Sequence, residues 1–157
     1  MKKFPAYLQI NEKIHSSGQP TWEQLEAISQ YGIEAVINLA LPTSDNAVEG
    51  EAEIVTLQGI PYFQIPVDFA HPKHSDFTLF SSILTNLSGR TVLIHCAYNK
   101  RVSAFIYIHN VLSGMPVTKA KKFLHTCWQP EGVWYSFIEE EIKMSNNIYN
   151  KTSGGND

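Results

Sequence analysis

The sequence predicts an α/β fold with a mainly parallel central sheet of four to five strands that is flanked by helices. Short apolar runs alternate along the chain with stretches of helical periodicity, and the sequence contains no repeat and no low-complexity linker. Strands that are separated by helices need right-handed crossovers, which place the helices over the faces of a parallel sheet. Hydrophobic residues make up 43% of the 157 residues and charged residues 17%, the balance of an ordinary globular protein.

The first half of the chain contains signals for three strands and two helices. A short edge strand is expected over residues 7–10. Thr21 is expected to begin a helix that continues to about Tyr31, because Gln24 completes a capping box and Gly32 is suited to end it. The remaining elements of this half are a buried strand over 35–39, a helix within 47–57 that stops at Gly59, and a strand over 62–65 that Pro66 closes.

The second half contains signals for four helices and one strand. A helix is expected to begin at Ser75 or Asp76 and to run through Leu84. The other expected elements are a strand over 91–94 after Gly89, a helix from about Val102 or Ser103 to Leu112, a helix over 118–125, and a helix over 133–144. We expect residues 1–149 to form a single domain and residues 150–157, which are polar with paired glycines, to form a disordered tail.

The composition argues against several classes of protein. The net charge of −3 lacks the basic excess of a general nucleic-acid or membrane-surface binder. Two cysteines make no disulfide framework, the first residues lack the apolar stretch of a signal peptide, and no run is long enough to span a membrane. We therefore expect a cytoplasmic protein in a reducing compartment, with no nucleic-acid or membrane partner. The oligomeric state is left open.

The segment from Thr91 to Phe105 is the most informative part of the sequence. A buried strand leads into His95 and Cys96, and after a short polar loop the chain enters a helix. A cysteine at this position lies among unpaired backbone N–H groups and at the positive end of a helix dipole. That environment favours a thiolate and also binds tetrahedral anions. The pattern predicts a nucleophile and an oxyanion cradle in one turn, with Lys100 and Arg101 as a local basic patch.

Two other loops are expected to meet this one. Ligands of open parallel sheets bind beyond the carboxyl ends of the strands. Asn38 lies beside Leu39 at the end of one predicted strand, and Asp68 follows the end of another. The topology therefore predicts that both residues lie near Cys96.

The segment from His95 and Cys96 to Arg101, followed by Ser103, resembles the signature loop of cysteine-dependent protein phosphatases. The sequence is more specifically similar to a bacterial dual-specificity-phosphatase-like family, formerly a domain of unknown function and related to the phosphatase-like domain associated with beta-lactamase hydrolases. The segments that carry this second likeness are His-Ser-Ser-Gly-Gln-Pro at 15–20, the strand at 35–39, and Tyr-x-x-Ile-Pro-Val at 62–67. The resemblance covers roughly residues 12–140. It implies a dual-specificity-phosphatase-like fold and the metal-free, cofactor-free hydrolysis of a phosphorylated small molecule or a phosphoprotein.

The resemblance also implies roles for individual residues. Cys96 would form a cysteinyl-phosphate, Arg101 would hold two phosphate oxygens, and Asp68 would be the general acid. Substrate-binding roles in the loop, mostly through backbone N–H groups, fall on His95, Ala97, Tyr98, Asn99, Lys100, Val102 and Ser103. The Ser103 hydroxyl would bond the thiolate or would equally serve as a helix cap, and His95 would orient the loop or be a satisfied core residue. Tyr98 would stack on an aryl substrate or face solvent.

Alternatives remain for the proton donor and for metal binding. His71, His74 and Asp76 follow Asp68, and either histidine or Asp76 could donate the proton instead. The same three residues are the only candidates for a metal site, which we do not expect because no further ligand matches them. Cys127 is expected to be a buried cysteine in an aromatic cluster, with the alternative that it forms a protective disulfide with Cys96.

The sequence departs from the phosphatase pattern in several places. Four residues separate Cys96 from Arg101, whereas tyrosine and dual-specificity phosphatases have five. Asn99 replaces a glycine where a left-handed backbone is needed, and Ala40 stands where the family has an arginine. These departures leave two other hypotheses open. One is a catalytically weak phosphate-binding module, and the other is a sulfurtransferase of the rhodanese type, whose active loop is similarly short.

Overall fold

The computed structural model describes residues 1–154 and contains a five-stranded sheet with helices on both faces. The strands are β1 (Leu8–Gln9), β2 (Ile14–Ser17), β3 (Ala35–Asn38), β4 (Tyr62–Gln64) and β5 (Val92–His95). The helices are α1 (Trp22–Glu26), the 3₁₀ helix η1 (Ile28–Tyr31), α2 (Glu51–Thr56), α3 (His74–Asn86), α4 (Lys100–Leu112), α5 (Val117–Cys127) and α6 (Val133–Ser153). The strand order is β1-β2-β5-β3-β4, and only the edge strand β1 is antiparallel to its neighbour. The predicted fold class is confirmed.

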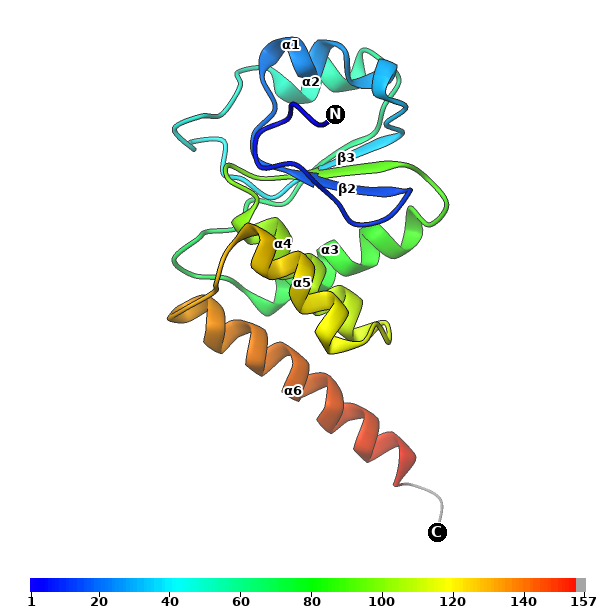
Figure 1. Ribbon diagram of the computed structural model, residues 1–157, viewed down its shortest axis with the longest axis vertical. Helices are drawn as coiled ribbons and strands as arrows, with labels where there is room; N and C mark the ends of the chain where they lie inside the picture. Colours follow the sequence, from blue (N-terminus) through cyan, green and yellow to red (C-terminus); the bar gives the residue numbers. More distant parts are fainter. Residues whose placement is uncertain (155–157) are drawn as a thin grey trace.

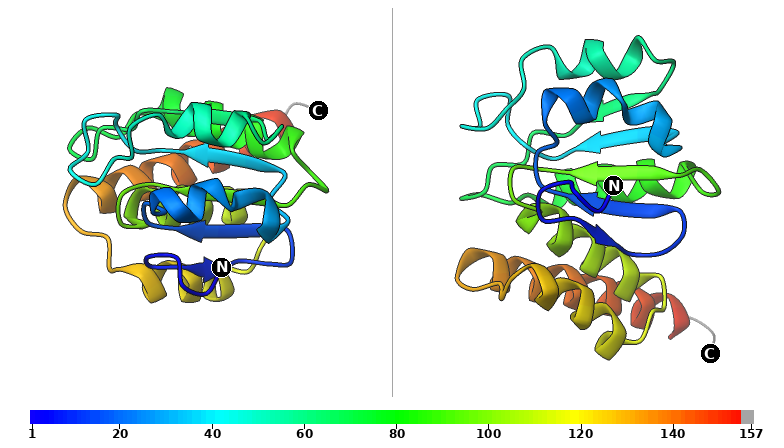
Figure 2. Two further views of the ribbon diagram at one scale, coloured as in Figure 1. Left: turned by 90° about the horizontal axis from the view of Figure 1, so that it is seen from above. Right: turned by 45° about the horizontal axis from the view of Figure 1, so that its top comes forward.

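The helices divide unequally between the two faces of the sheet. Helices α1 and α2 cover one face, while α3, α4 and α5 cover the other, and α6 packs outside this second layer (Figures 1 and 2). The C-terminal part of α6 runs beyond the body of the molecule (Figure 1). Because the second face carries more helices, the larger of the two cores lies there.

The central strands β3 and β5 contribute to both cores because alternate side chains point to opposite faces. Ile37 and Ile94 lie in the core beneath α3, α4 and α6, whereas Val36 and Leu93 lie in the core beneath α1 and α2. All four side chains are fully buried. Each such aliphatic side chain stabilises the fold by about 1.5–3 kcal/mol. The loop after β5 is therefore attached to the most buried part of the sheet.

Strand β2 was not predicted from the sequence. Its Ile-His-Ser-Ser sequence lacks the hydrophobic alternation that predicts a strand. The polar side chains can nevertheless be buried because they find hydrogen-bond partners inside the fold. The Ser16 hydroxyl donates to the Leu8 carbonyl at 3.2 Å, and a ring nitrogen of His15 lies 2.8 Å from the Tyr7 hydroxyl. The strand runs parallel to β5, and Ser17 is opposite His95. The residues that follow β2 consequently reach the same sheet edge as Cys96.

The capping box at Thr21 is confirmed. The Thr21 hydroxyl accepts the Gln24 backbone N–H at 3.2 Å, and the Thr21 N–H donates to the Gln24 side chain at 2.9 Å. Gly32 ends the helical segment with a φ of 75°. The predicted single helix is instead a five-residue α-helix followed by η1, with Ala27 between them.

All four later helices are longer than predicted, and α5 extends from Val117 to Cys127. Helix α3 begins at His74 and ends at Asn86, and α4 begins at Lys100 rather than near Val102. Helix α6 continues to Ser153, so the predicted end at Met144 is wrong, and residues 150–153 of the expected tail are helical. No glycine or proline interrupts residues 133–153, and Gly154 is the C-terminal cap. Residues 155–157 of the predicted tail lie outside the described residues.

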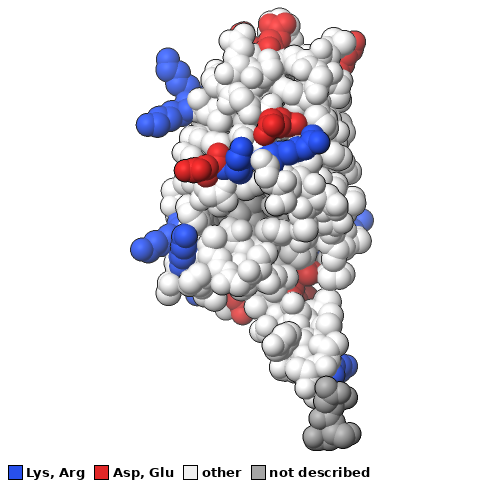
Figure 3. Space-filling view, turned by 90° about the vertical axis from the view of Figure 1, so that its right-hand side faces the viewer, with Lys and Arg blue, Asp and Glu red and all other residues white. Residues whose placement is uncertain are grey.

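The face of the molecule drawn in Figure 3 shows no large patch of a single charge. Basic and acidic side chains are interspersed on the face drawn in Figure 3, with uncharged surface between them. Among residues 1–154, no helix combines the length and the apolar character needed to cross a bilayer.

Candidate active site

The loops after β5 and β4 meet at one cavity of about 380 Å³ at the carboxyl edge of the sheet. The cavity brings together the three residues predicted to be catalytic, Cys96, Arg101 and Asp68. Its other lining residues are Leu41, Ser44, Asp45, Phe69, Tyr98 and Lys100. Asn38 does not reach this cavity, since it lines a neighbouring one and donates to the Tyr62 hydroxyl at 2.9 Å.

Cys96 is the first residue of the loop between β5 and α4, the cysteine loop, and most of the backbone N–H groups that follow it are free. Within the described residues, the N–H groups of Ala97, Tyr98, Lys100, Arg101 and Val102 donate to no backbone or side-chain acceptor. The flanking groups are engaged, because the Cys96 N–H donates to the Ser17 carbonyl at 3.4 Å and the Ser103 N–H to the Asn99 carbonyl at 3.0 Å. Free N–H groups at the start of a 13-residue helix are a favourable environment for an anion.

Arg101 places a cation beside this loop. Its side chain is only 7% exposed, and Nη1 donates to the Val67 carbonyl at 2.9 Å. The guanidinium forms no salt bridge with any carboxylate in residues 1–154. A buried charge is costly unless a counter-charge compensates it. The arrangement therefore leaves a positively charged fork that an anionic ligand in the cavity can neutralise.

The rear of the loop is tied to segments from the N-terminal part of the chain. Asn99 has the left-handed conformation expected of it, with a φ of 63°, and its side-chain amide donates to the Ala6 carbonyl at 2.8 Å and to the Ser16 hydroxyl at 3.0 Å. Gly18 lies so close that an added Cβ would be 2.8 Å from the Ala97 carbonyl oxygen. The Gly-Gln-Pro segment thus needs its glycine in order to pack against the cysteine loop.

His95 is fully buried and contacts a carboxylate. Its Nε2 lies 2.5 Å from Oε1 of Glu51, and its Nδ1 lies 3.4 Å from the Cys96 carbonyl oxygen. The other Glu51 oxygen accepts a bond from the Gln19 side chain at 3.1 Å. His95 is accordingly a satisfied core residue that also contacts the loop, so both sequence interpretations are compatible with its position.

Ser103 occupies the first turn of α4, where Asn99 is the N-terminal cap. Its hydroxyl donates to the Lys100 carbonyl at 3.0 Å and accepts the Trp128 indole N–H at 3.1 Å. The interpretation of Ser103 as the helix cap is therefore wrong, because the helix begins earlier than predicted. The Lys100 ammonium lies 5.4 Å from the centre of the Trp128 ring, which holds it at the edge of the cavity.

Asp68 is half-exposed at the rim of the cavity. The Ala70 N–H donates to its carboxylate at 2.9 Å, and His71 Nδ1 lies 3.1 Å away. The bond from the Ala70 N–H has the larger effect and the bond to His71 the smaller one, and together they hold the pKa of Asp68 below its usual value. The Asp68 carboxylate is thus stabilised as an anion in this loop conformation.

The alternative proton donors do not share this position. His71 bonds Asp68 itself, and His74 bonds both oxygens of Glu141 at 2.8 Å, a residue of α6. Asp76 lies in the first turn of α3. Within residues 1–154, no group of three histidine, cysteine or acidic side chains is placed to hold a metal ion.

Cys127 is the last residue of α5 and is only partly buried. Burial raises the pKa of its thiol, the Ser103 hydroxyl lowers it, and the charge of Cys96 raises it. Both cysteines are free thiols. A disulfide between Cys96 and Cys127 stays a prediction.

Sequence reasoning missed several residues of the site. Asp45 and Phe69 line the cavity, and Glu51 and Gln19 support it from behind. Phe69 directly follows Asp68 and could have been found by extending that loop by one residue. Glu51 resembles any acidic residue of a helix first turn, so nothing in its local sequence indicated a contact with His95.

Several solved protein structures are similar to this chain. No protein-family model and no curated protein matches the chain. A DUF442 protein from Shewanella putrefaciens CN-32, described as a candidate phosphatase, is 28% identical with a TM-score of 0.81, and the match covers 92% of this chain and 95% of that one.

Two more distant structures share the fold. The core catalytic domain of the PP-IP phosphatase Siw14 from S. cerevisiae is 16% identical with a TM-score of 0.72, over 96% of this chain and 94% of that chain. TpbA from P. aeruginosa in complex with phosphotyrosine is 10% identical with a TM-score of 0.66, over 90% and 91% of the two chains. The chain thus shares its fold with these three structures, and among them the DUF442 protein from Shewanella putrefaciens also resembles it in sequence.

Proposed function

We propose that this protein hydrolyses a phosphate monoester through a cysteinyl-phosphate intermediate. The observation that carries the proposal is the unpaired, buried Arg101 guanidinium beside Cys96 and a row of free backbone N–H groups. These groups can bind the oxygens of a phosphate while its phosphorus faces the thiol. The likeness to the DUF442 candidate phosphatase supports the same chemistry.

The reaction begins with attack of the Cys96 thiolate on phosphorus. The S–P bond forms as the bond from phosphorus to the ester oxygen breaks, and Arg101 with the loop N–H groups stabilises the charge on the other three oxygens. Asp68 gives its proton to the departing alkoxide or phenolate. In the second step, Asp68 accepts a proton from water as the water attacks phosphorus. The S–P bond then breaks, which regenerates the Cys96 thiolate and releases inorganic phosphate.

Asp68 is suited unequally to these two steps. Its lowered pKa favours the ionised form, which is the form that accepts a proton from water in the second step. The first step requires the protonated form, whose population falls as the pH rises above the lowered pKa. We therefore expect the first step to be fastest in acidic solution when the leaving group needs a proton.

The substrate is a phosphorylated small molecule or a phosphoprotein. Phe69 and Tyr98 line the cavity that contains Cys96, and both are exposed at 43% and 65%. An aromatic wall of this kind can pack against a flat leaving group. No metal or other cofactor takes part in the proposed reaction.

The experiment that tests this function measures phosphate release from an aryl phosphate between pH 5 and 8. The wild type is compared with Cys96→Ser and with Cys127→Ser, the matched control at the only other cysteine. We expect Cys96→Ser to lose turnover by at least about a hundredfold while remaining folded, and Cys127→Ser to keep it. Activity that survives Cys96→Ser would contradict the mechanism. Phosphate binding without turnover would favour a phosphate-binding module, and a persulfide on Cys96 would favour a sulfurtransferase.

A further inference from the structure

A second cavity adjoins the one that contains Cys96. It has a volume of about 470 Å³, and Leu41 and Ser44 line both cavities. The loop that carries these two residues is attached to the cysteine loop, because the Asn46 side-chain amide donates to the Ala97 carbonyl at 3.1 Å. Since the two cavities share part of their wall, a group esterified to a phosphate at Cys96 can extend past Leu41 and Ser44 into the second cavity.

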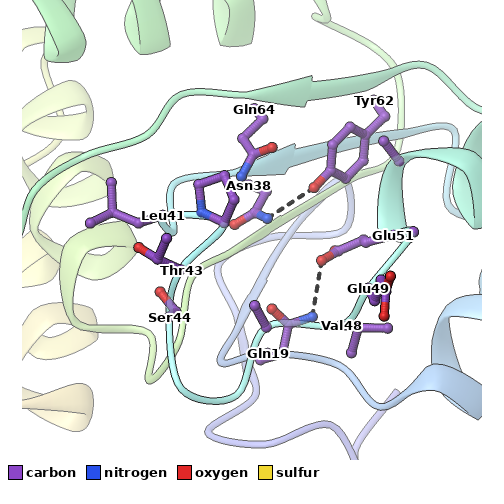
Figure 4. A pocket seen from close by; sticks show the side chains of 14 residues that line it. Gln19, Asn38, Leu41, Thr43, Ser44, Val48, Glu49, Glu51, Tyr62 and Gln64 are labelled. Carbon is purple, nitrogen blue, oxygen red and sulfur yellow. Dashed lines mark hydrogen bonds between the residues drawn. The ribbon is translucent and has the colours of Figure 1, made fainter.

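Buried polar side chains form much of the wall of the second cavity. Asn38, Gln19 and Glu51 line it and are 4%, 5% and 6% exposed. The Asn38 amide donates to the Tyr62 hydroxyl at 2.9 Å, and the Gln19 amide donates to Oε2 of Glu51 at 3.1 Å. Figure 4 shows the pair of Asn38 and Tyr62 across the cavity from the pair of Gln19 and Glu51. The two hydrogen bonds hold four polar side chains in place around the cavity.

Each of these pairs leaves one polar group without a partner. Within residues 1–154, the Tyr62 O–H donates to no acceptor, and Oε1 of Gln19 accepts from no donor. Burial, and after it the charge of Glu51, raises the pKa of Tyr62 to about 12, so its hydroxyl keeps the proton that it can donate. Polar groups that are buried without a hydrogen bond are costly. A ligand hydroxyl can both accept and donate, so hydroxyl groups match a wall with a free donor and a free acceptor.

The charged residues of the second cavity disfavour a second phosphate. Within the part of the chain that the structure describes, no lysine, arginine or histidine lines this cavity, whereas Glu49 and Glu51 do. The basic residues Lys100 and Arg101 line the cavity that contains Cys96 instead. Carboxylates repel an anion, but they accept hydrogen bonds from hydroxyl groups. A phosphate therefore fits the first cavity, and an uncharged hydroxylated group fits the second.

We propose that the second cavity binds the leaving group of the substrate, and that this group carries several hydroxyls and no further phosphate. A sugar or another polyol that is esterified once with phosphate has this chemistry. Its phosphate lies at Cys96 and Arg101, while its hydroxyls accept from Tyr62 and donate to Gln19. The inference rests on the proposed function and narrows its substrate to a small molecule rather than a phosphoprotein.

The experiment compares phosphate esters that are matched in carbon number and differ in their hydroxyls. Glucose 6-phosphate is paired with n-hexyl phosphate, and glycerol 1-phosphate with n-propyl phosphate. In at least one pair, we expect kcat/KM to be at least about tenfold higher for the hydroxylated ester, because the other ester leaves buried polar groups unpaired. The absence of this preference from both pairs would overturn the inference. A phosphoserine peptide with a higher kcat/KM than both hydroxylated esters would also overturn it.

Tyr62→Phe tests the wall of the cavity, because it removes the free donor and keeps the aromatic ring. It should reduce the preference for the hydroxylated ester by about threefold to tenfold. Tyr135→Phe is the matched control, since Tyr135 is exposed on α6 and lines neither cavity, and it should keep the preference. An unchanged preference in folded Tyr62→Phe would contradict the inference. If that variant does not fold, Glu49→Lys decides, because Glu49 is exposed. Its added cation should raise kcat/KM for glucose 1,6-bisphosphate relative to glucose 6-phosphate by about threefold, and an unchanged ratio would contradict the inference.

Failure of this inference and failure of the proposed function give different results. If the alkyl esters are hydrolysed as fast as their hydroxylated partners, the proposed function stands and this inference is wrong. If the wild type hydrolyses none of the esters, the proposed function is wrong, and calorimetric binding of the same esters to Cys96→Ser decides the inference. A Kd at least about tenfold lower for a hydroxylated ester than for its alkyl partner would support it, and equal Kd values in both pairs would overturn it.

Discussion

The rear of the cysteine loop is held by contacts between distant segments, whereas the rim of its cavity is held by contacts between neighbours. At the rear, Asn99 bonds Ala6 and Ser16, His95 bonds Glu51, and all of these contacts are largely buried. At the rim, Asp68 is half-exposed, and its partners are its near neighbours Ala70 and His71. The part of the site that would bind phosphate is thus fixed by the core of the fold.

This difference has a consequence for substrates. Contacts at the rear do not depend on which group is attached to the phosphate, so a substitution there should slow every substrate. Residues at the rim face the rest of the substrate, so a substitution there should discriminate among leaving groups. The predictions below test that division.

The largest effect is expected for Arg101→Lys. A lysine keeps the positive charge but cannot hold two phosphate oxygens with a planar fork or keep the bond to Val67 in the same geometry. We expect kcat/KM to fall by about a hundredfold to a thousandfold for aryl and alkyl phosphates alike. Lys100→Met is the control, because Lys100 already lies against Trp128, and it should cost less than about tenfold. Equal losses in the two variants would remove Arg101 from its proposed role.

A smaller and substrate-dependent effect is expected for Asp68→Asn. Hydrolysis of an alkyl phosphate should slow by at least about a hundredfold, because its leaving group needs a proton, and an aryl phosphate with an acidic phenol should lose less. The pKa of Asp68 is lowered, so its protonated form is lost as the pH rises through the acidic range. In the wild type, kcat/KM for the alkyl phosphate should therefore fall with increasing pH.

The asparagine variant should lose that pH dependence. Asp45→Asn is the matched control, since Asp45 lines the same cavity from another loop. If Asp45→Asn rather than Asp68→Asn removes the fall of kcat/KM with increasing pH, Asp45 is the general acid.

Gly18→Ala should lower kcat by about tenfold for every substrate. Its Cβ would lie 2.8 Å from the Ala97 carbonyl oxygen, so the cysteine loop has to shift. Overpacking of this kind costs about 1–3 kcal/mol of stability. Gly89→Ala is the comparison, because Gly89 has a φ of 86° but open space around it. That variant should lose stability in thermal unfolding and keep its kcat. Normal kcat in Gly18→Ala would show that the rear of the loop is less constrained than its contacts suggest.

The smallest effect is expected for Tyr98→Ala at the rim. The side chain is 65% exposed and lines the cavity, so it can stack on an aryl group without holding the phosphate. We expect KM for an aryl phosphate to rise about threefold to tenfold, with kcat and the alkyl-phosphate KM unchanged. An equal rise for both substrates would assign Tyr98 to the rear of the site rather than the rim.

Local sequence signals were sufficient for much of this architecture. Strands β3, β4 and β5 were found within one or two residues. For β3 and β5 the reason is that buried parallel strands are nearly continuous apolar runs. Cys96, Arg101 and Asp68 were expected near one another because they follow the carboxyl ends of strands, and the structure brings them to one cavity.

The parts that sequence reasoning missed depend on tertiary contacts. Strand β2 has the polar sequence Ile-His-Ser-Ser, whose side chains are satisfied only by partners elsewhere in the fold. The pair of Glu51 and His95 joins two residues that share no local pattern. Neither propensity nor periodicity carries information about such contacts, which is why the long-range contacts at the rear of the loop were not predicted.

The most direct test of the account is to trap the covalent intermediate. The wild type is mixed with an aryl phosphate, quenched in acid within the first turnover, and analysed by peptide mass spectrometry. The account predicts one added phosphoryl group on the peptide containing Cys96, present in Asp68→Asn for longer than in the wild type and absent from Cys96→Ser. Phosphate release without any phosphorylated Cys96, or with the phosphoryl group on another residue, would contradict it.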